Sequence, residues 1–264
     1  MQKVILKVIL AVCIVAAAVF ATLLIRELYI DWQSRSFYDN LVAGVPTRPR
    51  EPGRSGAENA QMPSQDSDDD DSIPWVPYVD FDALNMDFPG IVGWIILDGT
   101  FIDYPVMQYT DNDFFLTHLP DRTQHRSGSI FLDYRNKPDF SDKSILIYGH
   151  ETRAGDMFGV LKEYRDQEFF EANSVMYLHT PEKDYMLVLF AGHVAHSVRD
   201  HPPLDFADGD EFLEYIAHLK SISVFKSSVE VSADDTIISL VTCTYDFSNA
   251  RLILAGKLVE YYSE

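Results

Sequence analysis

The sequence predicts a mainly β protein with added helices, in which eight short strands close into a barrel behind an N-terminal membrane-spanning helix. Three features carry this prediction. An unbroken apolar run extends from Val8 to Ile25. A stretch rich in Pro, Gly, Ser and acidic residues, Ala43 to Ile73, separates that run from the rest of the chain. From Trp75 onwards, most apolar segments are short and bounded by turn residues, as strands are.

The charge, the apolar content and the number of cysteines exclude several classes of function. The 264 residues include 41 acidic and 21 basic side chains, a formal net charge of −20. Such an acidic chain lacks the clustered Lys and Arg that nucleic-acid phosphates require, so no nucleic-acid partner is expected. With 47% apolar and 23% charged residues, wholesale disorder is excluded. Two cysteines, Cys13 and Cys243, exclude a disulfide framework and a thiolate-only metal site.

The N-terminal run has the length of a membrane span. Its 18 residues form about 27 Å of helix, close to the ~30 Å hydrocarbon core. A cleaved signal peptide is the alternative, but its apolar region is usually only ~7–15 residues long. Because Lys3 and Lys7 precede the run, we expect a single-pass anchor in the cell membrane, with a cytoplasmic N-terminus and an extracellular body. This first region, 1–26, is the cytoplasmic tip and anchor.

The second predicted region, 27–74, joins the anchor to the body. Arg26 to Val42 mixes apolar and charged residues and is expected to form a helix that leaves the membrane. The stretch that follows, to Ile73, includes Asp68 to Asp71 and cannot bury enough apolar surface to fold, so we expect an acidic, disordered linker. A calcium site is the alternative, although the acidic run lacks the spaced ligands and glycine of a calcium loop.

The third predicted region, 75–264, contains the strands. Asp98-Gly99-Thr100 separates the first two as a hairpin turn. Two helical stretches interrupt the strands, 156–164 and a longer one from Asp208, where Asp208 and Glu211 form a capping-box pattern. Eight strands with few helices favour a closed or nearly closed barrel over a doubly wound sheet. The expected strands are 91–97, 101–107, 129–132, 144–148, 175–179, 185–193, 236–242 and 252–259.

Cys243 carries the strongest chemical signal. An exported protein generally pairs its cysteines or omits them, and Cys13 is expected to lie in lipid. Cys243 follows a predicted strand, and Arg251 lies where the next one begins. If those strands are antiparallel neighbours, the thiol and the guanidinium lie side by side, where a cation favours the thiolate and can bind a developing oxyanion. The alternative is a buried, inert thiol.

A nucleophilic thiol also needs an acid–base partner, most often histidine. His150 is the best placed of the eight because it follows the predicted strand 144–148, with Gly149 relieving backbone crowding. A metal site at His193, His196 and His201 is an alternative that no carboxylate–His motif supports, so we expect no metal and no other cofactor.

These residues together resemble the sortase family, membrane-anchored cysteine transpeptidases of mainly Gram-positive bacteria. Members carry a T-L-x-T-C segment with a downstream arginine, and this chain departs from it in having Ser239 at the first position. The resemblance is closest to class B and covers roughly 81–259. It rests on Tyr148-Gly149-His150, 240–247 with Ala250-Arg251, 104–108, Asp111-Asn112 with Leu116, 131–136, Met157-Phe158 and the helix from Asp208.

The resemblance implies a sortase-type barrel and a role for each site residue. Cys243 would attack a backbone carbonyl in the C-terminal sorting motif of a secreted protein and form a thioacyl intermediate. An amine of a peptidoglycan precursor or of a pilin would resolve it. His150 would transfer protons and Arg251 would hold the substrate carbonyl. Candidates for lining the substrate groove are Asn112, Leu116, Tyr148, Thr242 and Thr244.

Other functions stay open at this point. A papain-like protease also pairs Cys with His, but its nucleophile precedes its histidine, whereas His150 precedes Cys243 here. A pilin-polymerising sortase would use the same residues. A non-catalytic surface adhesion or haem-binding module would fit the anchor and the linker but would leave the Cys–His–Arg set unexplained.

Overall fold

The computed structural model describes residues 2–45, 47–48, 78–152 and 155–261. The chain divides into two compact units, Met1–Ala43 and Gly44–Glu264. The predicted boundaries at 26 and 74 mark expected roles in a cell, so they stay predictions.

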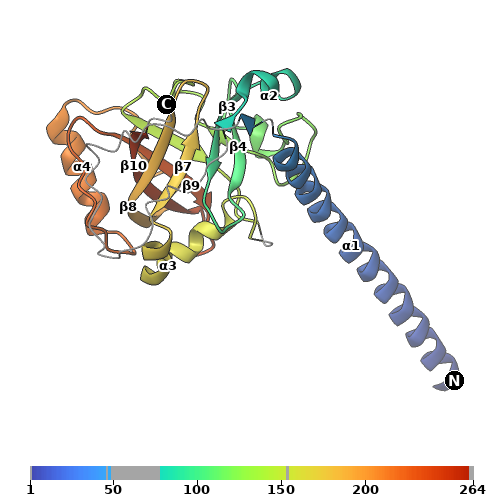
Figure 1. Cartoon of the computed structure of the whole chain (residues 1–264). Helices are drawn as coiled ribbons and strands as arrows, with labels where there is room; N and C mark the ends of the chain where they lie inside the picture. The colour runs from blue at the N-terminus through green and yellow to red at the C-terminus, as the bar shows by residue number, and fades with distance from the viewer. Residues whose placement is uncertain (1, 46, 49–77, 153–154, 262–264) are drawn as a thin grey trace, which may run out of the picture. The chain divides into compact units, whose positions relative to one another are not determined.

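The first unit is formed by one helix, α1 (Gln2–Gly44) (Figure 1). At ~1.5 Å rise per residue, its 43 residues extend about 65 Å, twice the thickness of a hydrocarbon core. It is long and apolar enough to cross a membrane, and its apolar side chains from Ile5 to Ile25 are exposed. The helix expected from Arg26 to Val42 is therefore the continuation of the apolar helix and not a separate element.

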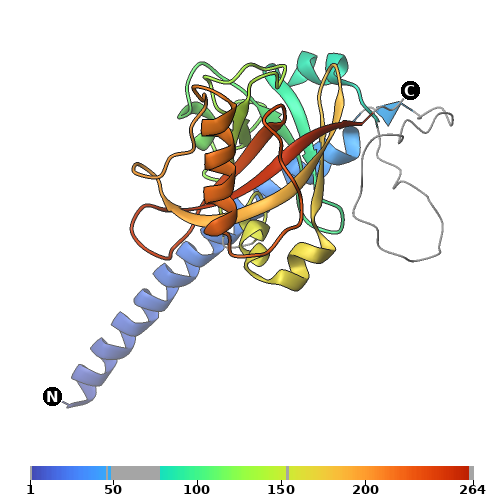
Figure 2. The same ribbon diagram turned by 90° about the vertical axis from the view of Figure 1, so that its left-hand side faces the viewer.

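The second unit is the closed eight-stranded barrel that the sequence predicted (Figures 1 and 2). Around the barrel the order is β10-β8-β7-β3-β4-β5-β6-β9, and β9 closes it by pairing with β10. Neighbours are antiparallel except for two parallel pairs, β4 with β5 and β6 with β9. The strands are β3 (Ile91–Ile96), β4 (Asp103–Met107), β5 (Ile130–Leu132), β6 (Ser144–Tyr148), β7 (Val175–His179), β8 (Asp184–His196), β9 (Thr236–Cys243) and β10 (Ala250–Tyr261).

Strands β8 and β10 run further than their apolar segments predicted. They pair along their whole length, from Ala250 opposite His196 to Tyr261 opposite Asp184. The ladder thus holds polar residues at the strand ends in extended backbone, Arg251 among them. Gly99, at the predicted hairpin between β3 and β4, has a φ of +71°, which glycine adopts without strain.

Most of the expected linker, 46 and 49–73, lies outside the described residues. Of the linker residues that the structure describes, Ala43 and Gly44 end α1, and β1 (Thr47–Arg48) pairs with β2 (Tyr78–Val79) in a short antiparallel sheet. The compact unit that contains the barrel accordingly begins at Gly44.

The helix predicted at 156–164 is wrong in type and in start. A 3₁₀ helix, η2 (Gly159–Arg165), occupies this stretch. Met157 has a φ of +55°, outside the helical range, and its N–H donates to the Tyr104 hydroxyl, so a helix can begin only after it. Three short helices were not predicted: α2 (Phe81–Asp87), η1 (Phe114–Leu116) and α3 (Gln167–Ala172).

The longer predicted helix is α4 (Gly209–Ser221), which covers the outside of the barrel (Figure 2). Asp208 caps it by accepting from the Glu211 N–H, and Glu211 accepts in return from the Ala207 N–H. The predicted stripe of Phe212, Ile216 and Leu219 is buried against Phe190 and Ala191 of β8 and Ile237 of β9.

Candidate active site

Three strand ends bring the predicted catalytic residues to one place. Because β6 and β9 are parallel, with Tyr148 opposite Val241, their C-terminal ends reach the same rim of the barrel. His150 lies two residues after Tyr148, and Cys243 lies two residues after Val241. Strand β10 returns antiparallel to β9 and sets Arg251 directly opposite Cys243. The neighbour relation that the sequence left conditional is thus confirmed.

The backbone around His150 is fixed by close packing. A Cβ on Gly149 would lie 2.6 Å from the Phe158 ring, so only glycine lets the chain pass there. The Nε2 atom of His150 lies 2.7 Å from the Leu116 carbonyl oxygen. A carbonyl can only accept, so Nε2 carries a proton, and Nδ1 is left to exchange one in a reaction.

The described residues leave most N–H donors of the Arg251 guanidinium free to bind a ligand. Its Nη1 donates to the neighbouring Ala250 carbonyl at 3.0 Å, and among the described residues no carboxylate pairs with it. The nearest plausible partner by sequence, Asp246, is taken by Arg165, whose Nη1 and Nη2 contact the two carboxylate oxygens at 2.9 and 2.5 Å. The hydrogen bonds from Arg165 and then from Thr244 hold the pKa of Asp246 far below its ordinary value.

Cys243, His150 and Arg251 border a groove of about 250 Å³. Its floor is apolar and is built by Ala195 of β8, Val241 of β9, Ile253 of β10 and Tyr148 of β6, which pack together. The predicted substrate-binding residues Asn112, Leu116, Tyr148 and Thr242 line it together with His150, Cys243 and Arg251. An apolar floor with a few convergent polar groups is typical of a ligand site.

Thr244 is the predicted binding residue that does not line this groove. Its hydroxyl donates to Asp246 at 2.7 Å and accepts from Arg165 at 3.1 Å, so it belongs to the loop between β9 and β10. Thr242 lines the groove with a buried hydroxyl, for which the described residues offer no hydrogen-bond partner.

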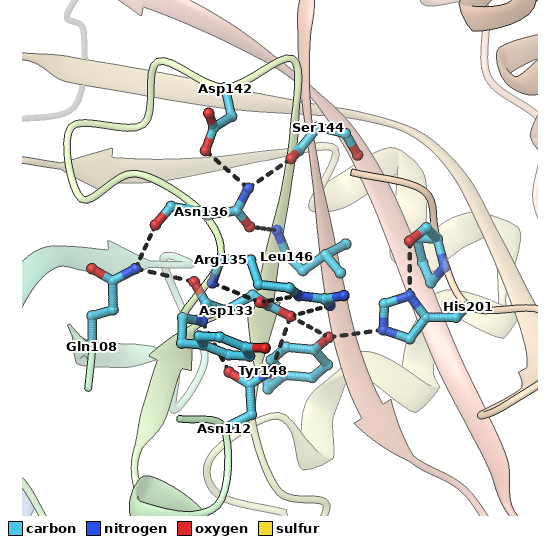
Figure 3. A network of polar contacts seen from close by, with 12 residues as sticks. Gln108, Asn112, Asp133, Arg135, Asn136, Asp142, Ser144, Leu146, Tyr148 and His201 are labelled. Atoms are coloured by element: carbon cyan, nitrogen blue, oxygen red, sulfur yellow. Dashed lines mark hydrogen bonds and ion pairs between the residues drawn. The ribbon is translucent and has the colours of Figure 1, made fainter. Parts of the chain in front are cut away.

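A buried carboxylate behind the groove wall was missed by the sequence reasoning. Asp133 accepts from Arg135, Asn112 and Tyr148 (Figure 3). Burial alone raises the pKa of Asp133, but these hydrogen bonds outweigh it and lower the pKa to about 2, so the carboxylate is ionised. Burial, and then the neighbouring Asp133 charge, raises the pKa of Tyr148 well above its ordinary value, so its hydroxyl keeps its proton.

Loop residues that were not predicted as site residues also line the groove. Asp200, His201 and Pro202, between β8 and α4, also line the groove, as does Asp113 before η1. The residues from Phe131 to Asn136 stood out in the sequence as a shared segment, but no sequence signal linked Asp133 to Asn112. Arg165 and Asp246 are 81 positions apart, and only the fold brings them together.

Comparisons with known proteins agree with this geometry. The sortase domain family profile matches residues 96–259. Sortase B of Listeria monocytogenes is 37% identical over 182 residues, which cover 68% of this chain and 73% of that protein. The chain belongs to the sortase family.

The similarity places this sortase in class B, as the sequence indicated. Sortase B of Staphylococcus aureus is 30% identical over 182 residues, 68% of this chain and 75% of that protein. Its structure in a substrate complex has a TM-score of 0.66 and covers 69% of this chain and 85% of that one. The Bacillus anthracis sortase B in complex with AAEK1 has a TM-score of 0.70 at 28% identity, covering 89% and 100%. Sortases are cysteine transpeptidases, so this chain is an enzyme of that class.

Proposed function

We propose that this sortase is anchored in the cell membrane and cleaves the C-terminal sorting motif of secreted proteins, which it transfers through a thioacyl intermediate to an amine of a cell-wall precursor. The pairing of Cys243 with Arg251 across β9 and β10, in one groove with His150, carries the proposal. No metal or other cofactor takes part in it.

The first half of the reaction is acyl transfer to the enzyme. With the thiol proton on His150 Nδ1, the Cys243 thiolate attacks the scissile carbonyl carbon, and the carbonyl oxygen becomes an oxyanion. Arg251, which has no carboxylate partner among the described residues, donates to that oxygen. When the C–N bond breaks, the leaving amine takes a proton from His150, and a thioester to Cys243 remains.

The second half returns the enzyme to its starting state. The acceptor amine attacks the thioester carbonyl and gives up a proton to His150. The C–S bond then breaks and a new amide bond joins the sorted protein to the acceptor. The hydrogen bond from His150 to the Leu116 carbonyl holds the imidazole in one orientation for both proton transfers. Asn112, Leu116, Tyr148 and Thr242 would bind the motif along the groove.

A peptide screen tests the proposal. The full chain in detergent micelles is incubated with a library of pentapeptide motifs and several amines, and cleavage and amide formation are followed by mass spectrometry. We expect one motif class to be cleaved and a thioester to Cys243 to accumulate when the amine is omitted. Cys243→Ala and His150→Ala should abolish both reactions.

Alkylation separates this function from a non-catalytic surface module. Iodoacetamide should label Cys243 stoichiometrically and stop cleavage, while Cys13 serves as an internal comparison. A chain that cleaves no peptide and whose Cys243 stays unlabelled would contradict the proposed function.

A further inference from the structure

The groove wall is built around one side chain that no substrate can touch. Asp133 is fully buried and does not line the groove, whereas Asn112 and Tyr148, which it binds, do. These two side chains come from different segments, Asn112 from the loop after β4 and Tyr148 from the end of β6. Figure 3 shows both pointing toward the Asp133 carboxylate.

The carboxylate is held from behind by a rigid turn. Gln108 donates to the carbonyls of Asp133 and Asn136 at 3.0 and 2.7 Å, and the Asp133 N–H donates to the Leu146 carbonyl at 2.9 Å. Asn136 is fixed in turn by Asp142, Ser144 and Leu146 (Figure 3). Asp133 therefore cannot follow its partners if they move, and the partners must adjust to it.

The carboxylate accepts more donors than it has lone pairs. Oδ1 accepts from the backbone N–H and Nε of Arg135 at 3.0 and 2.8 Å. Oδ2 accepts from Arg135 Nη2 at 2.7 Å and from Asn112 Nδ2 and the Tyr148 hydroxyl at 3.0 Å each. About four lone-pair sites are thus saturated by five donors, all of which need the ionised form.

This arrangement decides what the groove offers to a substrate. Because Asp133 only accepts and the Tyr134 N–H only donates, to Asn112 Oδ1 at 3.0 Å, the Asn112 amide has one orientation. It keeps one N–H for a ligand. The Tyr148 hydroxyl donates to Asp133, and His201 Nε2 lies 3.2 Å from the same oxygen, so protein groups on both sides hold the hydroxyl in place in the groove wall.

We propose that Asp133 is the positioning residue of the substrate groove: it orients Asn112 to present an N–H donor and fixes the Tyr148 hydroxyl in the groove wall, so that the groove selects a substrate with a carbonyl oxygen at the Asn112 position. The inference rests on the proposed function for its assay. Asp133 acts through its two partners and contacts no reacting atom.

Asp133→Asn tests this with the smallest change of shape. The amide cannot accept from all five donors, and its NH₂ group opposes that of Asn112. We expect KM for the peptide selected in the screen to rise about tenfold, with kcat changed less than threefold and the rate of Cys243 alkylation unchanged. Asp139→Asn, an exposed carboxylate in the same loop that accepts from the Ser141 N–H and has no groove partner, is the control and should leave KM unchanged.

A second background distinguishes positioning from a purely structural role. In Asn112→Ala/Tyr148→Phe, Asp133 has lost both side chains through which it acts, so adding Asp133→Asn should raise KM less than twofold further. A rise of the same size in both backgrounds, or an unchanged KM in a folded Asp133→Asn variant, would overturn the inference.

One readout does not depend on turnover. The side-chain amide signal of Asn112 in ¹H–¹⁵N spectra, assigned with Asn112→Ala, should lose its hydrogen-bonded shift in Asp133→Asn and keep it in Asp139→Asn. An unchanged signal in Asp133→Asn contradicts the proposal even if that variant processes peptide poorly. A wild-type chain that processes no peptide contradicts the proposed function instead, and the amide signal still tests Asp133.

Discussion

Arg251 lies opposite Cys243 with most of its guanidinium donors available, while Arg165 nearby is committed to Asp246. At the residue scale this separates the arginine that we propose to be catalytic from a structural one. It also removes the explanation that Arg251 holds the loop by pairing with Asp246, since that carboxylate is occupied.

We expect Arg251→Lys to be nearly as inactive as Arg251→Ala. A lysine keeps the charge but loses the planar fork that can donate two parallel hydrogen bonds to substrate carbonyls. Loss of one oxyanion donor typically costs ~10²–10³ in turnover. Transpeptidation and Cys243 alkylation rates should be measured for both variants. Alkylation should suffer less in the lysine variant because a positive charge still favours the thiolate. Near-normal turnover in Arg251→Lys would mean that charge alone matters.

His193 gives a second prediction at this scale, on stability. It is buried in β8 without a hydrogen-bond partner for Nδ1 among the described residues. Burial, and then the nearby His218, lowers the pKa of His193 to about 4, although Asp200 opposes this. Between pH 6.5 and 4 the unfolded chain therefore binds a proton that the folded chain does not, and stability falls as the pH falls.

The change His193→Leu should remove this pH dependence. We expect the free energy of unfolding of the wild type to fall by on the order of 3 kcal/mol more than that of the variant between pH 6.5 and pH 4. Urea unfolding of both chains in detergent micelles measures the difference. His218→Gln is the control and should keep most of the slope, because burial is the larger cause. Parallel slopes in wild type and His193→Leu would show that His193 does not titrate in this way.

How far the site could be predicted depends on sequence distance. Cys243, His150 and Arg251 were found because each lies at the end of a strand, and strand ends are readable from apolar periodicity. Asp133 and its partner Asn112 meet only because the loop between β4 and β5 folds back on itself, through turns that no periodic pattern encodes. The same holds for Thr244, whose hydroxyl faces Arg165 instead of the groove.

At the scale of elements, the strand pairs position the site and the short helices connect it. The eight strands were predicted because β-branched runs bounded by turn residues are distinctive. Helices α2 and α3 were missed because they have seven and six residues, too few for a helical period to show. The stretch before η2 was assigned to helix because nothing in its composition signals the positive φ of Met157.

The Arg165–Asp246 pair links two elements that border the candidate active site. It joins η2, which follows the His150 loop, to the loop from Thr244 to Asn249, whose two ends carry Cys243 and Arg251. Both side chains are partly exposed, so the pair adds little to global stability. Its effect should be local, on the geometry of the loop.

We expect Arg165→Ala to loosen this loop without unfolding the barrel. Hydrogen exchange of residues 244–249 should become about tenfold faster or more, while the melting temperature changes little and kcat falls several-fold. Lys162→Ala, an exposed cation on the same 3₁₀ helix, is the matched control and should alter none of the three. If the loop exchanges at the wild-type rate in Arg165→Ala, the link does not hold it.

At the scale of the whole molecule, the proposed action on secreted proteins requires the barrel to face the side of the membrane where they emerge. The apolar part of α1 is long enough to span the bilayer. The rest of the helix, from Arg26 to Gly44, lies between the apolar run and the barrel in the sequence. Lys3 and Lys7 precede the apolar run, and the positive-inside rule predicts that such a short basic segment stays in the cytoplasm. The barrel unit would then lie outside the cell.

Protease treatment of intact protoplasts checks this orientation. With an epitope tag at the N-terminus and an antibody against the barrel, we expect the barrel to be degraded while a short tagged fragment that contains the anchor stays protected. A cytoplasmic protein in the same sample must stay intact, and detergent must expose the tagged fragment.

The positive charges that flank the apolar run set the orientation, so reversing them on one side should change it. In Lys3→Glu/Lys7→Glu, Arg26 and Arg35 favour the opposite topology, and we expect the externally cleaved fraction to fall. A barrel protected in intact protoplasts would place it in the cytoplasm, where it cannot meet a secreted substrate, and the proposed cell-wall role would fail with the topology even if the peptide chemistry held.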